Sequence, residues 1–243
     1  MLDGMLYRVK LARPLPADRN RPDVLQKRVE YANWFMAIGV VRHCIFIDEC
    51  GYNIWTARNH GMARLGERAC RQVCRQRGRN LTVTMAISPI NMLIFHSALV
   101  VGMNAGRFAD FLTQVRLNLD PDENVVLIYD GAPAHRNAVN PGPNTEIKML
   151  PPYSPFLDPA EQAISCLKAA IKADISRPQI QADMNNRDEA RNRGVPLGIY
   201  RTNLLLEALP RNINTITQPK CAEWYRSMQT YLPRCLNGEM IEG

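Results

Sequence analysis

The chain has 243 residues, of which 46% are hydrophobic and 22% are charged, and its formal net charge is +7. This length can bury one sizeable core, and the composition is that of a folded globular protein and not of a wholly disordered one. The chain has no run of 18 apolar residues and its first residues lack the apolar core of a signal peptide, so we expect neither a membrane span nor secretion.

The N-terminal part of the chain predicts a lead-in, a helix and a first strand. Residues 1–22 contain Arg-Pro and Leu-Pro pairs, which are typical of an extended segment. Apolar residues recur at helical spacing between residues 24 and 36, and this pattern predicts an amphipathic helix. Residues 40–48 predict a strand, and its run from Cys44 to Ile47 is apolar on both faces, as in the centre of a sheet.

Residues 58–79 carry most of the net charge. They contain seven arginines and a single acidic residue, Glu67, which gives the segment a charge of +6. A polyanion is the leading partner for such a segment, and nucleic acid is the commonest polyanion. A solvated arginine face or a nuclear-import signal would give the same pattern. The arginines are Arg58, Arg64, Arg68, Arg71, Arg75, Arg77 and Arg79.

The middle of the chain predicts a hairpin followed by alternating helices and strands. Apolar runs at 81–87 and 92–100 are separated by a short turn, so they predict two antiparallel strands. Further strands are expected at 125–129 and 146–150, and helices at 104–117, with Asn104 as N-cap, and at 158–175. Because strands joined through a helix are commonly parallel, this order predicts an α/β fold with a mixed sheet and helices on its faces.

The composition changes after residue 177. Residues 179–194 are polar and charged and predict a surface loop or an exposed helix, whereas 199–209 and 220–232 predict helices. We expect residues 233–243 to form a trailing tail. The predicted organisation is a lead-in and linker helix (1–37), an α/β domain (38–177) and a polar loop with a helical extension (178–243).

Three acidic residues stand at the ends of predicted elements. Asp48 and Asp130 each follow an apolar strand, and Glu161 opens the helix that follows a Pro-Pro-Tyr-Ser-Pro sequence. If the two strands are neighbours, both aspartates emerge side by side at one edge of the sheet. Phosphodiester cleavage needs a polarised phosphorus, an activated water and a stabilised leaving oxygen, and two divalent ions held by carboxylates can supply all three. The three acids therefore predict metal-dependent phosphoryl transfer.

Each of these acids also has an ordinary structural interpretation. The two that follow strands could each bind a loop amide or belong to a turn. Asp158, Pro159 and Glu161 fit the start of a helix, with Asp158 at the N-cap and Glu161 as a capping-box acid. Lys168 and Lys172 lie on the same helical stripe as Glu161, which suits either phosphate contacts or a solvated helix face.

Three segments resemble the signature blocks of mariner-type DDE transposases. They are Phe-Ile-Asp-Glu at 46–49, Tyr-Asp-Gly-Ala-Pro-Ala-His at 129–135 and Leu-Pro-Pro-Tyr-Ser-Pro-Phe-Leu-Asp-Pro-Ala-Glu at 150–161. The third is the most specific, since a Pro-Pro-Tyr-Ser-Pro loop before an acid-bearing helix is rare elsewhere. The resemblance covers roughly residues 24–176, and the stretch 224–233 is similar to the C-terminal helix of that family.

The resemblance implies a fold, a reaction and a set of site residues. The expected fold is RNase H-like, with a mixed five-stranded sheet, flanking helices and a helical C-terminal extension. The expected activity is cut-and-paste DNA transposition in the nucleus, if the source is eukaryotic, by a possible homodimer. Asp48, Asp130 and Glu161 would bind two Mg²⁺ or Mn²⁺ ions, and His135 would lie near them in a role that stays open.

The sequence departs from the family pattern at three points. Asp158 stands where the family usually has asparagine. The 30 residues between Asp130 and Glu161 are a few fewer than usual, and the deficit falls in 136–145, where a helix is expected. Family members carry paired helix-turn-helix modules upstream, so we expect a truncated copy. Two alternatives remain: a transposase-derived DNA-binding protein without activity, and an RNase H-like nuclease for RNA–DNA hybrids.

Overall fold

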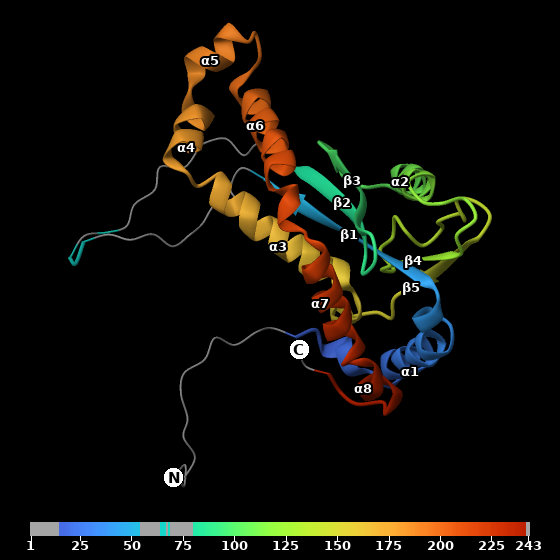
Figure 1. Ribbon diagram of the computed structural model, residues 1–243. Coiled ribbons are helices and arrows are strands. Elements are labelled where there is room, and N and C mark those ends of the chain that lie inside the picture. The colour runs from blue at the N-terminus through green and yellow to red at the C-terminus, as the bar shows by residue number, and fades with distance from the viewer. Residues whose placement is uncertain (1–14, 54–63, 67, 69–79, 242–243) are drawn as a thin grey trace, which may run out of the picture.

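A single mixed sheet forms the centre of the protein. The computed structural model describes residues 15–53, 64–66, 68 and 80–241 (Figure 1). The strand order is β3-β2-β1-β4-β5, in which β1, β2 and β3 are antiparallel neighbours and β4 and β5 run parallel to β1. The predicted mixed five-stranded sheet is confirmed. Its strands are β1 (His43–Tyr52), β2 (Leu81–Ser88), β3 (Met92–Leu99), β4 (Val125–Tyr129) and β5 (Thr145–Met149).

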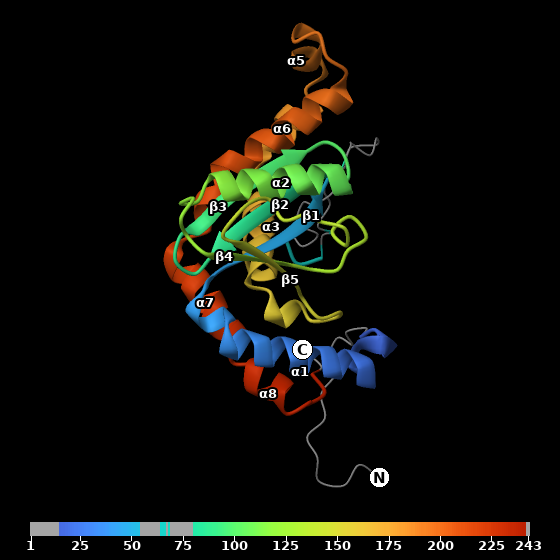
Figure 2. The ribbon, with the colours of Figure 1, turned by 90° about the vertical axis from the view of Figure 1, so that its right-hand side faces the viewer.

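Helices cover both faces of the sheet. Helix α2 (Ala105–Leu117) lies on one face, and α3 (Pro159–Asp174) lies on the other, where it packs against α6 (Leu197–Asn212) and α7 (Gln218–Gln229) (Figures 1 and 2). None of the described helices combines the length and the apolar character that a membrane crossing requires. The other α-helices are α1 (Pro22–Ala37), α4 (Pro178–Asn185), α5 (Arg187–Asn192) and α8 (Leu232–Leu236).

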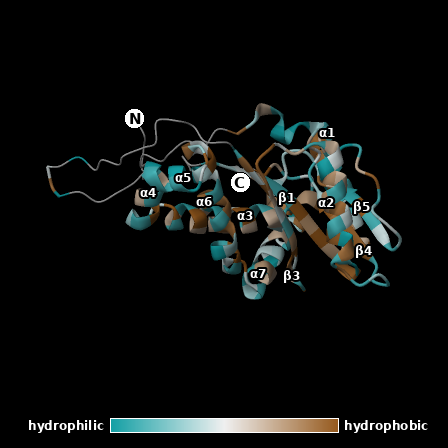
Figure 3. Cartoon of the chain, turned by 90° about the horizontal axis from the view of Figure 1, so that it is seen from above, coloured by the Kyte–Doolittle hydropathy of each residue, from teal (hydrophilic) through white to brown (hydrophobic). Residues whose placement is uncertain are grey.

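The alternation of side chains along the strands divides the core into two layers. Successive side chains of a strand point to opposite faces of the sheet. Phe46 and Ile128 therefore pack under α3, whereas Ile45 and Leu127 pack under α2. All five residues of β4 are buried, and Figure 3 shows this strand in the hydrophobic colour. The sheet is consequently rigid where its central strands deliver polar residues to one edge.

Two predicted helix caps are confirmed. Asn104 Oδ1 accepts a hydrogen bond from the backbone N–H of Arg107 at 2.9 Å, which satisfies a free donor in the first turn of α2. Asp158 Oδ1 accepts in the same way from the N–H of Ala160 at 2.9 Å, and Pro159 occupies the first position of α3. The cap fixes the start of α3 and so the direction of its first turn.

Two predictions are wrong, one about where a strand ends and one about the C-terminal segment. Asp48 does not end its strand, because β1 continues to Tyr52 and its residues 46–52 pair with β2. Residues 233–243 do not form a trailing tail over their described part, because α8 packs against α1 and Ile241 is buried. Arg19 Nε also donates a hydrogen bond to the Ile241 carbonyl at 2.9 Å. Both errors concern pairings with distant segments, which local patterns do not report.

Candidate active site

Acidic side chains from three elements line one pocket of about 450 Å³. Asp48 comes from β1, Asp130 follows β4 directly, and Glu161 belongs to the first turn of α3. Parallel pairing of Ile47 with Tyr129 places the two aspartates at adjacent positions of neighbouring strands. The pocket is lined by Asp48, Asp130, Gly131, Ala132, Arg136, Leu150, Pro151, Pro152, Tyr153, Ser154, Pro155, Asp158 and Glu161. The structure thus brings the three predicted acids together.

The acids of this pocket repel one another. Burial, together with the charge of Glu161, raises the pKa of Asp48 to about 7. Burial and the charge of Asp48 raise the pKa of Asp158 well above its ordinary value. Burial and the charge of Asp130 raise the pKa of Glu161, although Lys168 opposes this shift. A group of carboxylates with too little positive charge around it is an environment that a cation would relieve.

Asp130 differs from the other acids because it contacts the side chain of a histidine. Its Oδ1 lies 2.6 Å from Nδ1 of His135, and this hydrogen bond lowers the pKa of Asp130. Burial disfavours the charged imidazole, but the hydrogen bond and the charge of Asp130 outweigh burial and raise the pKa of His135. The imidazole also stacks on Phe108 with ring centres 3.8 Å apart. His135 therefore holds Asp130 in its ionised form.

Replacing His135 by glutamine tests this contact through pH. A raised histidine pKa contributes stability that is present below about pH 6.5 and is lost at higher pH, and a lowered aspartate pKa contributes stability that is lost below about pH 4. We expect the melting temperature of the wild type to exceed that of His135→Gln most between these limits, and less at pH 9. Thermal unfolding across pH measures this difference. A difference that does not vary with pH would come from the lost Phe108 packing alone.

Glu49 is a further acid of this region that sequence reasoning missed. Its Oε2 atom is buried and has no hydrogen-bond partner, and burial raises the pKa of Glu49. Because Asp48 and Glu49 are consecutive in a strand, their side chains leave on opposite faces. Glu49 interacts electrostatically with His135 and Asp130. No sequence signal separates it from an exposed strand acid, because its burial comes from tertiary packing.

The predicted basic residues fall in two groups. Arg64 and Arg68 are exposed, whereas Arg58, Arg71, Arg75, Arg77 and Arg79 lie outside the described residues. Lys168 stands beside the acids, since its Nζ lies 5.7 Å from the centre of the Tyr52 ring and its charge acts on Glu161. Lys172, one turn further along α3, is half-buried. Of the two lysines, only Lys168 acts on the pocket.

Arg28, on the N-terminal helix α1, holds the loop before Glu161 in place. Tyr153 has a φ of 54°, a left-handed conformation that is uncommon for residues other than glycine. Arg28 of α1 donates hydrogen bonds to Ser154 Oγ at 2.8 Å and to the Tyr153 carbonyl at 3.0 Å. Residues 131–144 form turns and contain no helix, so the helix expected at 136–145 from the family resemblance is missing, and the proline, glycine and asparagine content of the segment explains its turns.

The donor atoms of the pocket suit a hard cation. Carboxylate oxygens are the ligands that Mg²⁺ and Mn²⁺ prefer, and a buried acid with a raised pKa binds such an ion in place of a proton. Within the described ranges, however, the side chains do not form a closed cluster of three or more acidic, histidine or cysteine ligands. The acids thus fit a divalent ion by their chemistry, and they surround a pocket and not a preformed cage.

The fold and the pocket define a class of protein in which a mixed sheet and one helix deliver carboxylates to a common site. The family model described as DDE superfamily endonuclease matches residues 43–182, which is more than half of the chain. The chain belongs to the DDE superfamily of endonucleases. Among curated proteins, none matches it.

Solved structures of Mos1 transposase are similar to this chain. A pre-cleavage Mos1 transpososome matches with a TM-score of 0.66 and 14% identity, over 99% of this chain and 69% of that chain. The Mos1 paired-end complex with the left transposon end matches with a TM-score of 0.64, 14% identity and the same coverage of both chains. The catalytic domain of Mos1 mariner transposase matches with a TM-score of 0.58 and 11% identity, over 96% of this chain and 100% of that chain. At these identities the likeness shows the fold, and the expected RNase H-like fold is confirmed.

Proposed function

We propose that this chain is a DDE transposase catalytic domain, which cleaves DNA at transposon ends and joins the freed 3′-hydroxyl to target DNA. The observation that carries this proposal is the common pocket of Asp48, Asp130 and Glu161. Three residues from three separate elements face one space, at the cost of mutual repulsion that raises the pKa values of two of them. A purely structural set of acids would avoid this cost. Membership of the endonuclease superfamily supports the same reaction.

Divalent cations complete this proposal. Asp48, Asp130 and Glu161 would hold Mg²⁺ or Mn²⁺, and Mos1 paired-end complexes have been solved with Mn and with Mg. Bound to the acids, two such ions supply polarisation of the phosphate and acidify a water molecule. We propose that two such ions bind.

The other residues of the pocket orient the acids. His135 keeps Asp130 ionised, so that it presents a charged oxygen to the pocket at neutral pH. Asp158 caps α3 through the Ala160 N–H and thereby fixes the turn that carries Glu161. Arg136 lines the pocket and is exposed, so its guanidinium can contact a phosphate of the substrate.

DNA is the partner that this reaction requires. The exposed Arg64 and Arg68, together with the five predicted arginines outside the described residues, would contact phosphates without reading sequence. Lys168 would extend this contact beside Glu161. Action on chromosomal DNA would place the protein in the nucleus of a eukaryotic cell, and a homodimer would let two copies act on two transposon ends.

Cleavage of plasmid DNA in the presence of divalent cations tests the proposal. We expect the purified chain to nick or linearise supercoiled DNA in Mg²⁺ or Mn²⁺ and to leave it intact in EDTA, because the acids repel a phosphate when no cation lies between them. Gel electrophoresis measures the products. DNA binding without cleavage in either metal would contradict the proposal, and selective cleavage of RNA–DNA hybrids would point to an RNase H-type nuclease.

Asp158→Asn is the matched substitution in the same assay. Burial and Asp48 raise the pKa of Asp158, so a neutral amide resembles the form that the site favours, and its oxygen can still cap α3. We expect this variant to retain cleavage, in agreement with the asparagine usual in the family. Loss of cleavage in a folded Asp158→Asn protein would show that the charge of Asp158 is itself required.

A further inference from the structure

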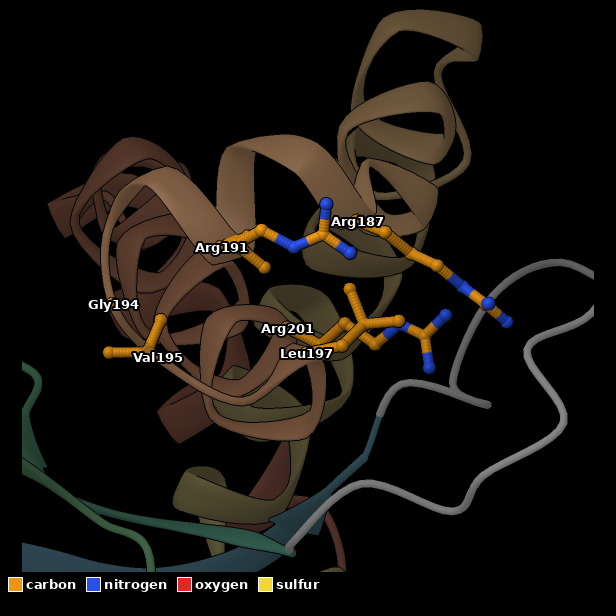
Figure 4. Close-up of a pocket in the computed structure, with 7 residues that line it drawn as sticks. Arg187, Arg191, Gly194, Val195, Leu197 and Arg201 are labelled. Atoms are coloured by element: carbon orange, nitrogen blue, oxygen red, sulfur yellow. The ribbon is translucent and has the colours of Figure 1, made fainter.

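A second pocket, of about 660 Å³, lies in the helical extension between α5 and α6. Arginines 187, 191 and 201 line it together with Gly194 and Leu197 (Figure 4). Figure 4 shows the side chains of Arg187 and Arg201 extending toward the same side, with the guanidinium of Arg191 above Leu197. We propose that this arginine pocket binds backbone phosphates of duplex DNA at a distance from the acids. The proposal rests on the function proposed above.

Arg201 gives the pocket a fixed positive charge. Its side chain is 6% exposed, and it donates hydrogen bonds from Nε to the Met184 carbonyl at 2.7 Å and from Nη2 to Asn185 Oδ1 at 3.3 Å. Both acceptors are neutral, and within the described residues no carboxylate forms an ion pair with Arg201. A buried charge without a counter-charge is costly. An anion in the pocket would supply that counter-charge.

Arg187 and Arg191 add two charges that can adapt to a ligand. Both are exposed, and the pocket is not lined by any acidic residue of the described chain. Arg191 lies 3.7 Å from Asp188, but both side chains are more than 80% exposed, so water weakens this pair. Gly194 has a φ of 65°, which permits the tight turn that brings α5 over the start of α6. Three arginines thus line a pocket whose described lining contains no acidic residue.

Phosphate is the anion that this geometry suits. A guanidinium presents planar pairs of N–H groups that match phosphate oxygens, and several of them along a groove follow a nucleic-acid backbone. Helix α5 and the start of α6, whose residues line the pocket, lie beyond the C-terminal end of α3 (Figure 1), whereas Glu161 belongs to the first turn of α3. The 16 residues of α3 span about 24 Å, which equals about seven base pairs of duplex. A duplex that contacts both places must therefore be longer than about seven base pairs.

Fluorescence anisotropy with the whole chain tests the proposal. A labelled duplex of roughly 30 base pairs is titrated in EDTA, at several salt concentrations, with wild-type protein and with Arg187→Gln/Arg191→Gln. We expect the double substitution to raise Kd about tenfold and to reduce the slope of log K against log salt by about 1 to 2, because each phosphate contact contributes about 0.9 to that slope. An unchanged slope would overturn the proposal.

Arg107→Gln/Arg226→Gln is the matched control. These two arginines are exposed on α2 and α7, and their replacement changes the net charge by the same amount. We expect wild-type affinity and slope. Equal weakening by both pairs would show a general charge effect and would overturn the proposal. Because EDTA prevents metal-dependent cleavage, the result does not depend on whether the protein is an active endonuclease.

Inorganic phosphate distinguishes a DNA site from a site for a free anion. At equal ionic strength, phosphate and chloride are compared as competitors of DNA and as stabilisers in thermal unfolding. Competition by phosphate that disappears in Arg187→Gln/Arg191→Gln supports the pocket as the phosphate contact of DNA. Stabilisation by phosphate without any effect of the substitutions on DNA binding would assign the pocket to a small anion and overturn the proposal.

Discussion

Asp48→Asn is expected to abolish metal-dependent cleavage and, at the same time, to stabilise the metal-free protein. An amide cannot hold a divalent cation as a carboxylate does, so cleavage should fall by at least about a hundredfold to a thousandfold. The gain in stability has a different origin. Burial and Glu161 raise the pKa of Asp48 to about 7, so its ionisation at high pH opposes folding. The asparagine variant is free of that penalty.

The sign of this effect follows from linkage. The unfolded chain ionises an aspartate near pH 4, whereas the folded protein ionises Asp48 near pH 7. Wild-type stability relative to the variant is complete below the lower value and falls as pH rises toward the higher one. In EDTA at pH 8 the variant should be more stable by on the order of 3 kcal/mol, and at pH 5 by much less. Urea unfolding at both pH values measures the difference.

Asp130→Asn provides the contrast. His135 lowers the pKa of Asp130, so ionised Asp130 favours folding and its replacement should not stabilise the protein. We expect this variant to lose cleavage as severely as Asp48→Asn, without the gain at pH 8. Wild-type cleavage by either variant would rule out these acids as metal ligands. A stability gain that is equal at pH 5 and pH 8 would exclude charge repulsion as its cause.

Arg28→Met is expected to destabilise the fold by roughly 2 to 4 kcal/mol, because it leaves one buried and three partly buried acceptors without this donor. Arg28 is 1% exposed and donates to Ser154, to Asn20 and to the carbonyls of Arg19 and Tyr153, at 2.8 to 3.0 Å. Methionine fills a similar volume but offers no donor. Since two of these acceptors belong to the loop that borders the acid pocket, that loop should lose its fixed position.

Two measurements separate this positioning role from stability alone. Urea unfolding gives the loss of stability, and the metal concentration for half-maximal cleavage reports the placement of the acids in the folded fraction. We expect the second value to rise in Arg28→Met and to recover partly in Arg28→Lys, which restores a charged donor. Lys27→Met, an exposed neighbour on α1, should change stability by less than about 0.5 kcal/mol. Equal behaviour of Arg28→Met and Lys27→Met would refute the role of Arg28.

Local patterns predicted most of the fold because local physics forms most of its elements. Strand β4 matches the predicted range 125–129, because a run of five apolar residues is typical of a strand that is buried on both faces. Asn104 and Asp158 were predicted as caps because a side-chain oxygen at a helix start satisfies a free N–H. The length of β1 was not predictable, because residues 49–52 become a strand through their pairing with β2.

The candidate site was predictable only where it depends on local sequence. Asp130 and Glu161 stand at element ends, Asp48 lies inside β1, and all three belong to the motif segments and line one pocket. The 2.6 Å contact of Asp130 with His135, whose ring stacks on Phe108 of α2, and the buried oxygen of Glu49 both depend on tertiary packing. Arg28 reaches Ser154 across 126 positions of sequence, and no periodicity or spacing rule reports such a contact.

Asn20 joins the two ends of the described chain. Its Oδ1 accepts hydrogen bonds both from Arg28 and from the backbone N–H of Ile241, at 3.0 and 3.4 Å. A single amide thus links the backbone of Ile241 to the arginine that braces the Tyr153 loop. The two ends of the described chain are therefore coupled through Asn20 and Arg28 to the Tyr153 loop, which lines the acid pocket.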